Sequence, residues 1–201
     1  MTTTPPTSVE FSFDPGCPFT WRTSRWLSDV AARAGFPVQW RLMSLAVLNE
    51  GQEIPEQFRE ARRQGWRALR LLAAAQQAGG PDAVGRLYTA LGRRRHEQGQ
   101  SYGDDVFSDA VAEAGLPAEL VQAADDVSCD APIQASHEEG QRRAGTALGS
   151  PILALDGARG YFGPIVVPPP HGAEADRLFE AVRLLSSIPG FSELKTARAP
   201  L

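Results

Sequence analysis

Cys17 is the residue whose type and setting best suit covalent chemistry in this sequence. It follows the turn segment 14–16 (Asp-Pro-Gly) and precedes Pro18, which suits the first turn of a helix because no amide hydrogen is needed there. Unpaired amides and the helix dipole stabilise an anion at a helix N-terminus, and the thiolate is the reactive form of cysteine. We therefore expect Cys17 to be a nucleophile with a lowered pKa, rather than a buried structural cysteine.

Thr20 stands where a C-x-x-C redox motif carries its second sulfur. A hydroxyl cannot close a disulfide, so a mixed disulfide on Cys17 needs another thiol to resolve it, most simply a small diffusible one. We expect the Thr20 hydroxyl to donate a hydrogen bond to the Cys17 thiolate one turn away, with an ordinary helix residue as the alternative. Cys129 is a weaker candidate for a distant resolving thiol, and we expect it to be structural.

Three aromatic residues, Phe19, Trp21 and Phe58, are candidates for an aromatic wall beside Cys17. Aromatic side chains of a helix belong to the core more often than to a binding surface. Phe19 shares the exposed first turn with Pro18, so it is the strongest of the three. We expect Pro18, Phe19 and Trp21 to contribute to a binding surface for a substrate or small thiol.

Hydrophobic periodicity indicates the elements that position Cys17. Segment 9–13 alternates apolar and polar residues as a strand does, and segment 37–43 alternates again. Between them, apolar residues at helical spacing indicate a helix that ends at Gly35. A crossover of this length makes the two strands parallel and the connection right-handed. The pattern thus predicts a β-α-β unit with Cys17 at the junction of strand and helix.

A helical stretch is predicted from about residue 55 to about residue 147. Glycine and proline residues interrupt it, and the expected helices are 55–78, one from 82 to about His96, 104–114 and 132–147. Arginine runs within this stretch are interpreted as a solvated face; they are 62–63, 93–95 and 142–143.

The end of the chain returns to the strand period. A strand over 151–155, a hairpin turn at Asp156-Gly157, a return strand from 160 and a helix over 173–186 are expected. The order β-α-β, helical block, β-β-α predicts an α/β thioredoxin fold interrupted by an all-helical insertion. We expect residues 1–48 and 148–201 to form the thioredoxin-like domain and residues 49–147 the helical insertion domain.

The residues from Phe13 to Trp21 (FDPGCPFTW), followed by 24–26 (SRW), resemble the DsbA-like family that includes the mycothiol-dependent nitroreductases. Three further segments are similar to that family: 43–50 (MSLAVLNE), 96–99 (HEQG) and 161–164 (YFGP). The resemblance covers nearly the whole chain in order. Members of the group carry Cys-Pro-Trp-Cys, so this sequence departs at Phe19 and at Thr20, and the second change removes the resolving thiol.

The resemblance implies further site residues. A cis-proline packs against the active-site cysteine in thioredoxin-like proteins, and Pro151 matches its position before the third strand. The residue before that proline offers backbone groups to an extended substrate, which we expect of Ser150. Asn49 and His96 lie in family-like segments and are expected to line the cleft between insertion and core, with a structural role as the alternative.

Composition narrows the partners. A net charge of −4 argues against nucleic acid, and no apolar run approaches the roughly 18 residues needed to cross a membrane. The segment 1–8 is polar and unlike a secretory signal, so we expect a cytoplasmic protein. Histidines, cysteines and carboxylates show no metal-ligand spacing, and we expect no metal. The oligomeric state is open.

These observations predict a thiol oxidoreductase that uses the single Cys17 and a small thiol to reduce disulfides or electrophilic small molecules, including nitroaromatics. The resemblance implies mycothiol as the thiol, with no tightly bound cofactor. One alternative is an enzyme similar to kappa-class glutathione transferases or isomerases, which activates a bound thiol. A non-catalytic thioredoxin-like binding protein is a third possibility, against which the intact Cys17-Pro18 and Ser150-Pro151 argue.

Overall fold

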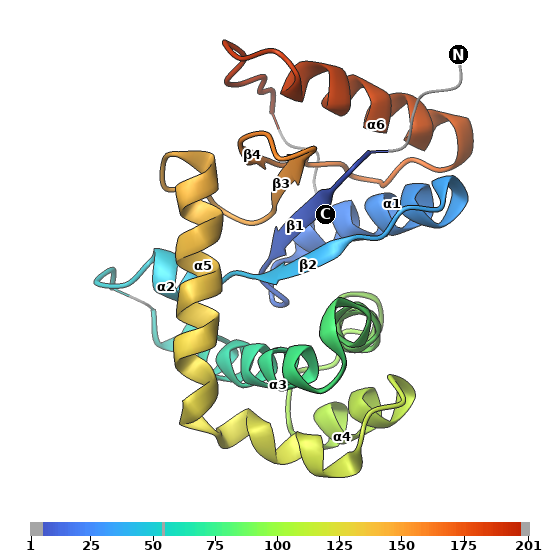
Figure 1. The fold of residues 1–201 in the computed structure, drawn as a ribbon. Helices are drawn as coiled ribbons and strands as arrows, with labels where there is room; N and C mark the ends of the chain where they lie inside the picture. Colours follow the sequence, from blue (N-terminus) through green and yellow to red (C-terminus); the bar gives the residue numbers. More distant parts are fainter. Residues whose placement is uncertain (1–5, 54, 198–201) are drawn as a thin grey trace.

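The computed structural model describes residues 6–53 and 55–197. Its centre is a four-stranded sheet in the order β2-β1-β3-β4 (Figure 1). β1 pairs in parallel with β2 and antiparallel with β3, and β3 pairs antiparallel with β4. The parallel pair confirms the predicted β-α-β unit. The strands are β1 (Val9–Phe13), β2 (Gln39–Leu42), β3 (Ile152–Leu155) and β4 (Tyr161–Phe162).

Helix α1 (Pro18–Ala34) connects β1 to β2. It ends at Gly35, whose φ of 74° lies in the left-handed region that glycine adopts without strain, as the sequence predicts. The last helix, α6 (Gly172–Ser186), lies beside α1 (Figure 1). The Trp26 indole donates to the carbonyl of Ala175 over 3.1 Å, so a buried polar atom fixes the contact between the two helices.

The segment between β2 and β3 is helical, as predicted. The long helix α3 is interrupted at Gly79 and Gly80, where φ and ψ leave the helical region, and this confirms the predicted break. The last helix of the block begins at Asp130, earlier than expected, because Pro132 is tolerated in a first turn. The elements are α2 (Leu45–Leu48), α3 (Glu56–Gly92), η1 (Arg93–Glu97), α4 (Asp104–Glu113), η2 (Ala118–Asp125), η3 (Val127–Cys129) and α5 (Asp130–Ala144).

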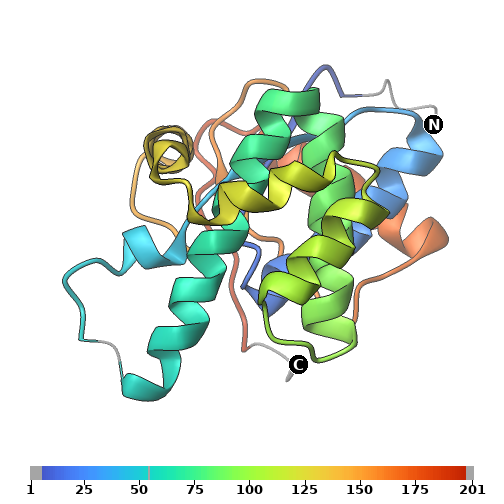
Figure 2. The ribbon, with the colours of Figure 1, turned by 90° about the horizontal axis from the view of Figure 1, so that it is seen from below.

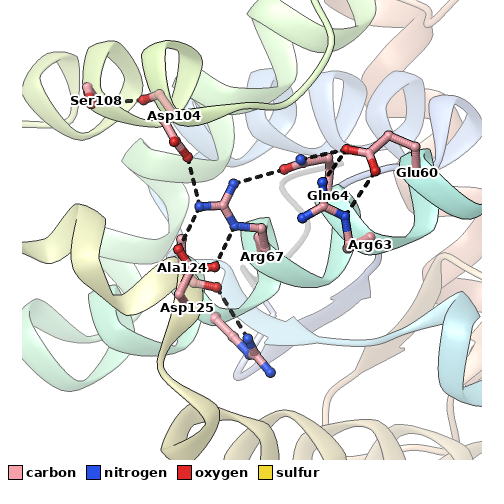
Figure 3. A network of polar contacts seen from close by, with 9 residues as sticks. Glu60, Arg63, Gln64, Arg67, Asp104, Ser108, Ala124 and Asp125 are labelled. Carbon is pink, nitrogen blue, oxygen red and sulfur yellow. Dashed lines mark hydrogen bonds and ion pairs between the residues drawn. The ribbon is translucent and has the colours of Figure 1, made fainter.

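Arg67 of α3 links this helix to α4 and η2 through hydrogen bonds and ion pairs. Its guanidinium donates to Asp104 at the start of α4 over 2.7 Å and to both carboxylate oxygens of Asp125 at the end of η2 (Figure 3). Arg70, one turn further on, donates to the carbonyl of Ala124 and pairs with Asp130. These two arginines therefore hold α4, η2 and α5 against α3.

The two faces of the sheet are covered differently. Phe11 and Phe13 face a core shared with α1 and α3, where the rings of Phe13 and Tyr88 have centroids 4.0 Å apart. Helix α5 lies across the other face (Figures 1 and 2), where a Cβ at Gly140 would lie 3.2 Å from the Ser12 hydroxyl. The order of strands and helices is that of a thioredoxin fold with a helical insertion. The exact domain bounds given above stay a prediction.

Candidate active site

Cys17 is the N-cap of α1, directly after the turn that ends β1. Its backbone is extended, with φ −84° and ψ 115°, and its carbonyl accepts the first helical hydrogen bond from the Trp21 amide. The Cys17 amide donates to the carbonyl of Asp14 over 3.1 Å and closes the turn. The thiol therefore stands at the amide end of a helix, as the sequence predicts.

The environment of the Cys17 thiol opposes ionisation. The residue is 8% exposed, and its Sγ lies 3.8 Å from the carbonyl oxygen of Ser150, which can accept the thiol proton. Burial raises the pKa of Cys17, and the charge of Asp14 raises it further; hydrogen bonds from Thr20 and from the Phe19 amide act in the opposite direction. The predicted lowering of the pKa is thus wrong in this structure, because desolvation outweighs the helix terminus.

Two buried hydroxyls form a chain that leads to the sulfur. Thr20 Oγ1 and Ser150 Oγ are 2.8 Å apart, and the Asp14 amide donates to Ser150 Oγ over 2.9 Å. Hydrogen bonding by the Thr20 side chain also lowers the pKa of Cys17. Either hydroxyl can be the donor in this contact, and when Ser150 donates to Thr20 the Thr20 proton is left for the sulfur. The bond between Ser150 and Pro151 is cis.

Asp14 was expected to be only a turn residue, and the structure gives it a larger part. Its carboxylate accepts the amide of Gly16 over 2.8 Å and the amide of Leu45, at the start of α2, over 2.7 Å. Burial raises the pKa of this carboxyl, and the two amide hydrogen bonds lower it. The contact with Gly16 is a local turn that the sequence could have suggested, whereas the contact with Leu45 depends on the fold.

His96 and Tyr102 both hydrogen-bond to the turn that precedes Cys17. His96 Nε2 lies 2.8 Å from the Pro15 carbonyl and the Tyr102 hydroxyl lies 2.9 Å from the same oxygen, so both groups donate to it. The His96 ring also stacks on Trp21, with centroids 5.8 Å apart. Burial lowers the pKa of His96, which favours the neutral ring. The described contacts of His96 are therefore those of a positioning residue, and Tyr102 was missed by sequence reasoning.

The aromatic candidates divide by burial. Trp21 is 1% exposed and packs against Tyr88 and under the guanidinium of Arg25, so in this structure its ring belongs to the core and presents no surface to a ligand. Pro18 and Phe19 are half-buried in the first turn, beside the thiol. Phe58 is 55% exposed near the start of α3.

The remaining candidates lie apart from the sulfur in their contacts. The Asn49 side-chain amide donates to the carbonyl of Leu45 over 2.7 Å and so closes the end of α2. Cys129 is buried in η3, and both cysteines are free thiols. Within residues 6–53 and 55–197, no group of histidine, cysteine and carboxylate side chains could hold a metal, and no helix has the length and apolar character to cross a bilayer.

The family model that matches this chain and its fold together define the class: the protein is a thiol-dependent oxidoreductase, and its thioredoxin fold is of the DsbA-like type. A family model described as mycothiol-dependent nitroreductase Rv2466c matches residues 16–196. The chain belongs to this Rv2466c-like family.

Individual proteins and solved structures are also similar to this chain. The uncharacterized protein Rv2286c of Mycobacterium tuberculosis is 32% identical over 198 residues, which cover 96% of this chain and 84% of that protein. A probable DsbA oxidoreductase from Streptomyces coelicolor has a TM-score of 0.61 at 20% identity, covering 96% of this chain and 94% of its own. The cytosolic disulfide reductase DsbM of Pseudomonas aeruginosa, solved with GSH, has a TM-score of 0.59 at 18% identity, over 88% and 98% of the two chains. The two structural likenesses show the fold.

Proposed function

We propose that this protein reduces disulfides or electrophilic small molecules, such as nitroaromatics, with Cys17 as its nucleophile and mycothiol as the diffusible thiol. The observation that carries the proposal is the single sulfur at the start of α1 with the Thr20 hydroxyl beside it. Membership of the Rv2466c-like family supports the choice of thiol. A site with one sulfur can form a mixed disulfide but cannot resolve it alone.

The proposed disulfide reaction has two exchange steps. The Cys17 thiolate attacks the thiol-derived sulfur of a mixed disulfide, the S–S bond breaks, and the substrate half leaves as a thiolate that takes a proton. The thiolate of a second small-thiol molecule then attacks the mixed disulfide on Cys17, and Cys17 leaves as a thiolate. The substrate disulfide gains two electrons overall, and two small-thiol molecules end as one symmetrical disulfide.

A nitroaromatic would consume the same two electrons. Two thiols become one disulfide, the nitro group becomes a nitroso group, and the oxygen lost from nitrogen leaves as water with the two thiol protons. Cys17 would carry one of the sulfurs through the cycle as a mixed disulfide. The two substrate classes therefore share the resolution step on Cys17.

The surrounding groups have distinct parts in this proposal. The Ser150 carbonyl holds the proton of the resting thiol, and the Thr20 hydroxyl stabilises the sulfur when it carries charge, above all when Cys17 leaves from the mixed disulfide. Pro18 and Phe19 border the sulfur as binding residues, together with Ser150 and Pro151. His96 acts on the site through the Pro15 carbonyl, and Asn49 through α2.

A second candidate function is activation of a bound small thiol for transfer or isomerisation, without a covalent intermediate on Cys17. The raised pKa of the buried Cys17 thiol favours it, because a protonated sulfur is a poor nucleophile but can still donate a hydrogen bond to another thiolate. The mass of the intact protein after exposure to oxidised mycothiol separates the two functions. An adduct on Cys17 supports the first, and its absence supports the second.

Replacement of Cys17 by serine tests the proposal directly. We expect C17S to lose turnover of a mycothiol mixed disulfide and of a nitroaromatic in the presence of mycothiol, while the matched variant C129S keeps both. Full activity of C17S would exclude thiolate catalysis by this residue.

The free state of both cysteines and the cytosolic neighbour DsbM support a reducing compartment, and we propose the cytoplasm.

A further inference from the structure

The exposed face of the first turns of α1 carries a cation next to the proposed nucleophile. Arg22 follows Pro18 by four residues and Phe19 by three, so the three side chains share one face of the helix. All three side chains are half-buried, and the first of them, Pro18, directly follows Cys17. Among the described residues, Arg22 makes no ion pair with a carboxylate. A substrate that reaches the sulfur over Pro18 and Phe19 therefore meets an available guanidinium.

Arg95 brings a second cation to the same place from the helical block. It lies in η1 beside His96, and its guanidinium stands 5.8 Å from the centroid of the Tyr102 ring. The Tyr102 hydroxyl and His96 Nε2 both reach the Pro15 carbonyl, two residues before Cys17. The Arg95 guanidinium donates a hydrogen bond to the Gln100 carbonyl, and within the described part of the chain Arg95 has no carboxylate partner.

Arg22 and Arg95 lie on either side of a stacked pair of rings. Arg22 follows Trp21 in α1, Arg95 precedes His96 in η1, and the rings of Trp21 and His96 stack with centroids 5.8 Å apart. Burial lowers the pKa of His96, and the positive charges of Arg95 and Arg22 lower it further. Neighbouring arginines behave differently, because Arg93 and Arg94 are both paired with Glu113. The nearby Glu97 is exposed and acts on Arg25. Among the described residues, two arginines without a carboxylate partner thus adjoin the Trp21–His96 stack.

We propose that Arg22 and Arg95 form an anion-binding subsite beside Cys17, which takes a carboxylate or comparable negative group on the molecule that Cys17 attacks. The proposal rests on the proposed function and names its substrate class. Guanidinium groups suit this task because their planar N–H donors match carboxylate oxygens and stay charged at every physiological pH. Uncompensated cations at a cleft also raise the local concentration of an anionic reactant.

Two aromatic disulfides test the subsite without any need for mycothiol. The anionic reagent is 5,5′-dithiobis(2-nitrobenzoate), which carries two carboxylates, and the neutral reagent is 2,2′-dithiodipyridine. Each reacts with a thiolate by the same exchange and releases a coloured thiol, so the rate reports attack by the protein sulfur. All proteins carry C129S, so that Cys17 is the reacting thiol. The comparison is R22Q/R95Q with the unsubstituted background.

The matched control is R59Q/R177Q, which removes the same charge from exposed arginines on α3 and α6. We expect R22Q/R95Q to react about tenfold more slowly with the anionic reagent and within about twofold of the background with the neutral one. The control should follow the background with both reagents. High salt should slow the background protein with the anionic reagent and barely affect R22Q/R95Q, because screening acts on exposed charges.

Three results of the comparison between variants would overturn the subsite: an unchanged rate of R22Q/R95Q with the anionic reagent, an equal slowing with both reagents, or an equal effect of the control variant. Equal slowing would show that the arginines act on Cys17 itself rather than on the reagent. A background protein whose Cys17 fails to react even with the neutral reagent would contradict the proposed function, on which the subsite rests. Reaction with the neutral reagent alone would contradict the subsite and leave the nucleophile intact.

Discussion

Thr20 Oγ1 lies 2.8 Å from Ser150 Oγ, and both residues are buried, with exposures of 0% and 4%. The contact connects the first turn of α1 to the residue before Pro151, across 130 positions of sequence. It also fixes the hydroxyl that hydrogen-bonds to Cys17. The motif has therefore lost a sulfur that could be oxidised and has kept a polar partner for the sulfur that remains.

The Thr20 hydroxyl predicts a measurable loss when it is removed. Thr20→Val keeps the shape of the side chain but removes the hydrogen bond that lowers the pKa of Cys17, so the thiolate fraction at a given pH must fall. Hydrogen bonds to charged groups contribute about 1.5–3 kcal/mol, so alkylation of Cys17 by iodoacetamide at neutral pH should slow by about tenfold or more. Rates measured across a pH series in a C129S background check this.

The conservative variant Thr20→Ser separates the hydroxyl from the packing. It retains the oxygen and should restore most of the alkylation rate. If Thr20→Val alkylates as fast as the background protein, the hydrogen bond from Thr20 has no effect on the sulfur. If Thr20→Ser is as slow as the valine variant, the loss comes from packing instead.

Removal of the Asp14 charge is predicted to lower the pKa of Cys17, which is opposite to the effect of removing the Thr20 hydroxyl. Its negative charge raises the pKa of Cys17, so Asp14→Asn should shift the pH profile of alkylation to lower pH. The asparagine amide can replace one of the two oxygens that accept the amides of Gly16 and Leu45, and the turn should therefore persist. A profile that stays in place or moves to higher pH would contradict a charged Asp14 beside the thiol.

The sequence predicted the parts of the fold that depend on local order. Alternation over β1 and β2, the helix that ends at Gly35, the break at Gly79 and Gly80 and the position of Cys17 at a helix start all follow from residues that are close in sequence. These features need only the periodicity of apolar side chains and the conformations that glycine and proline allow.

The details of the site could not be predicted, because they are contacts between distant segments. The hydrogen bond from His96 to the Pro15 carbonyl spans 81 positions, and that from Tyr102 spans 87. The burial that reverses the expected pKa shift of Cys17 likewise arises from the helical block and the Ser150 loop together. Trp21 was expected near a ligand because of its place in the motif, and only the packing of α3 shows that it is enclosed.

His96 and Tyr102 predict a shared effect on the loop that carries Cys17. Each donates to the Pro15 carbonyl, so His96→Phe and Tyr102→Phe each remove one donor and leave the other, at a cost of about 1 kcal/mol in unfolding free energy. The double variant leaves the carbonyl without either donor and should cost more than the sum. Urea unfolding of the four proteins measures the coupling. If the losses of unfolding free energy in the two single variants add up to the loss in the double variant, the two donors are not coupled through the Pro15 carbonyl.

Buried histidines predict a loss of stability on acidification. Burial lowers the pKa of His96 and of His137, whose Nδ1 accepts the Ser44 amide. As the pH falls, the unfolded chain therefore takes up protons at a higher pH than the folded chain does. The stability that these histidines contribute is fully present above about pH 6.5 and is lost as the pH falls through their pKa values in the folded state. Unfolding free energy measured from pH 7.5 to 5 should decrease, and His137→Gln should flatten the slope. The exposed His171, replaced by glutamine, controls for histidine loss.

Gly92 of α3 predicts the largest effect of a single methyl group. A Cβ at this position would overlap the six-membered ring of Trp21, which is enclosed and cannot move away. Overpacking of a core typically costs about 1–3 kcal/mol, so Gly92→Ala should lower the unfolding free energy by at least that amount. The displaced ring should also weaken the stacking on His96 and slow alkylation of Cys17.

Gly65, on the same helix, provides the matched control. A Cβ there would meet no atom within 4 Å, so Gly65→Ala should stabilise the protein by about 0.5–1 kcal/mol through the better helix propensity of alanine. Urea denaturation of the two variants beside the unsubstituted protein gives both signs in one experiment. Equal effects of the two substitutions would show that the contact between Gly92 and Trp21 does not limit the packing behind the Cys17 loop.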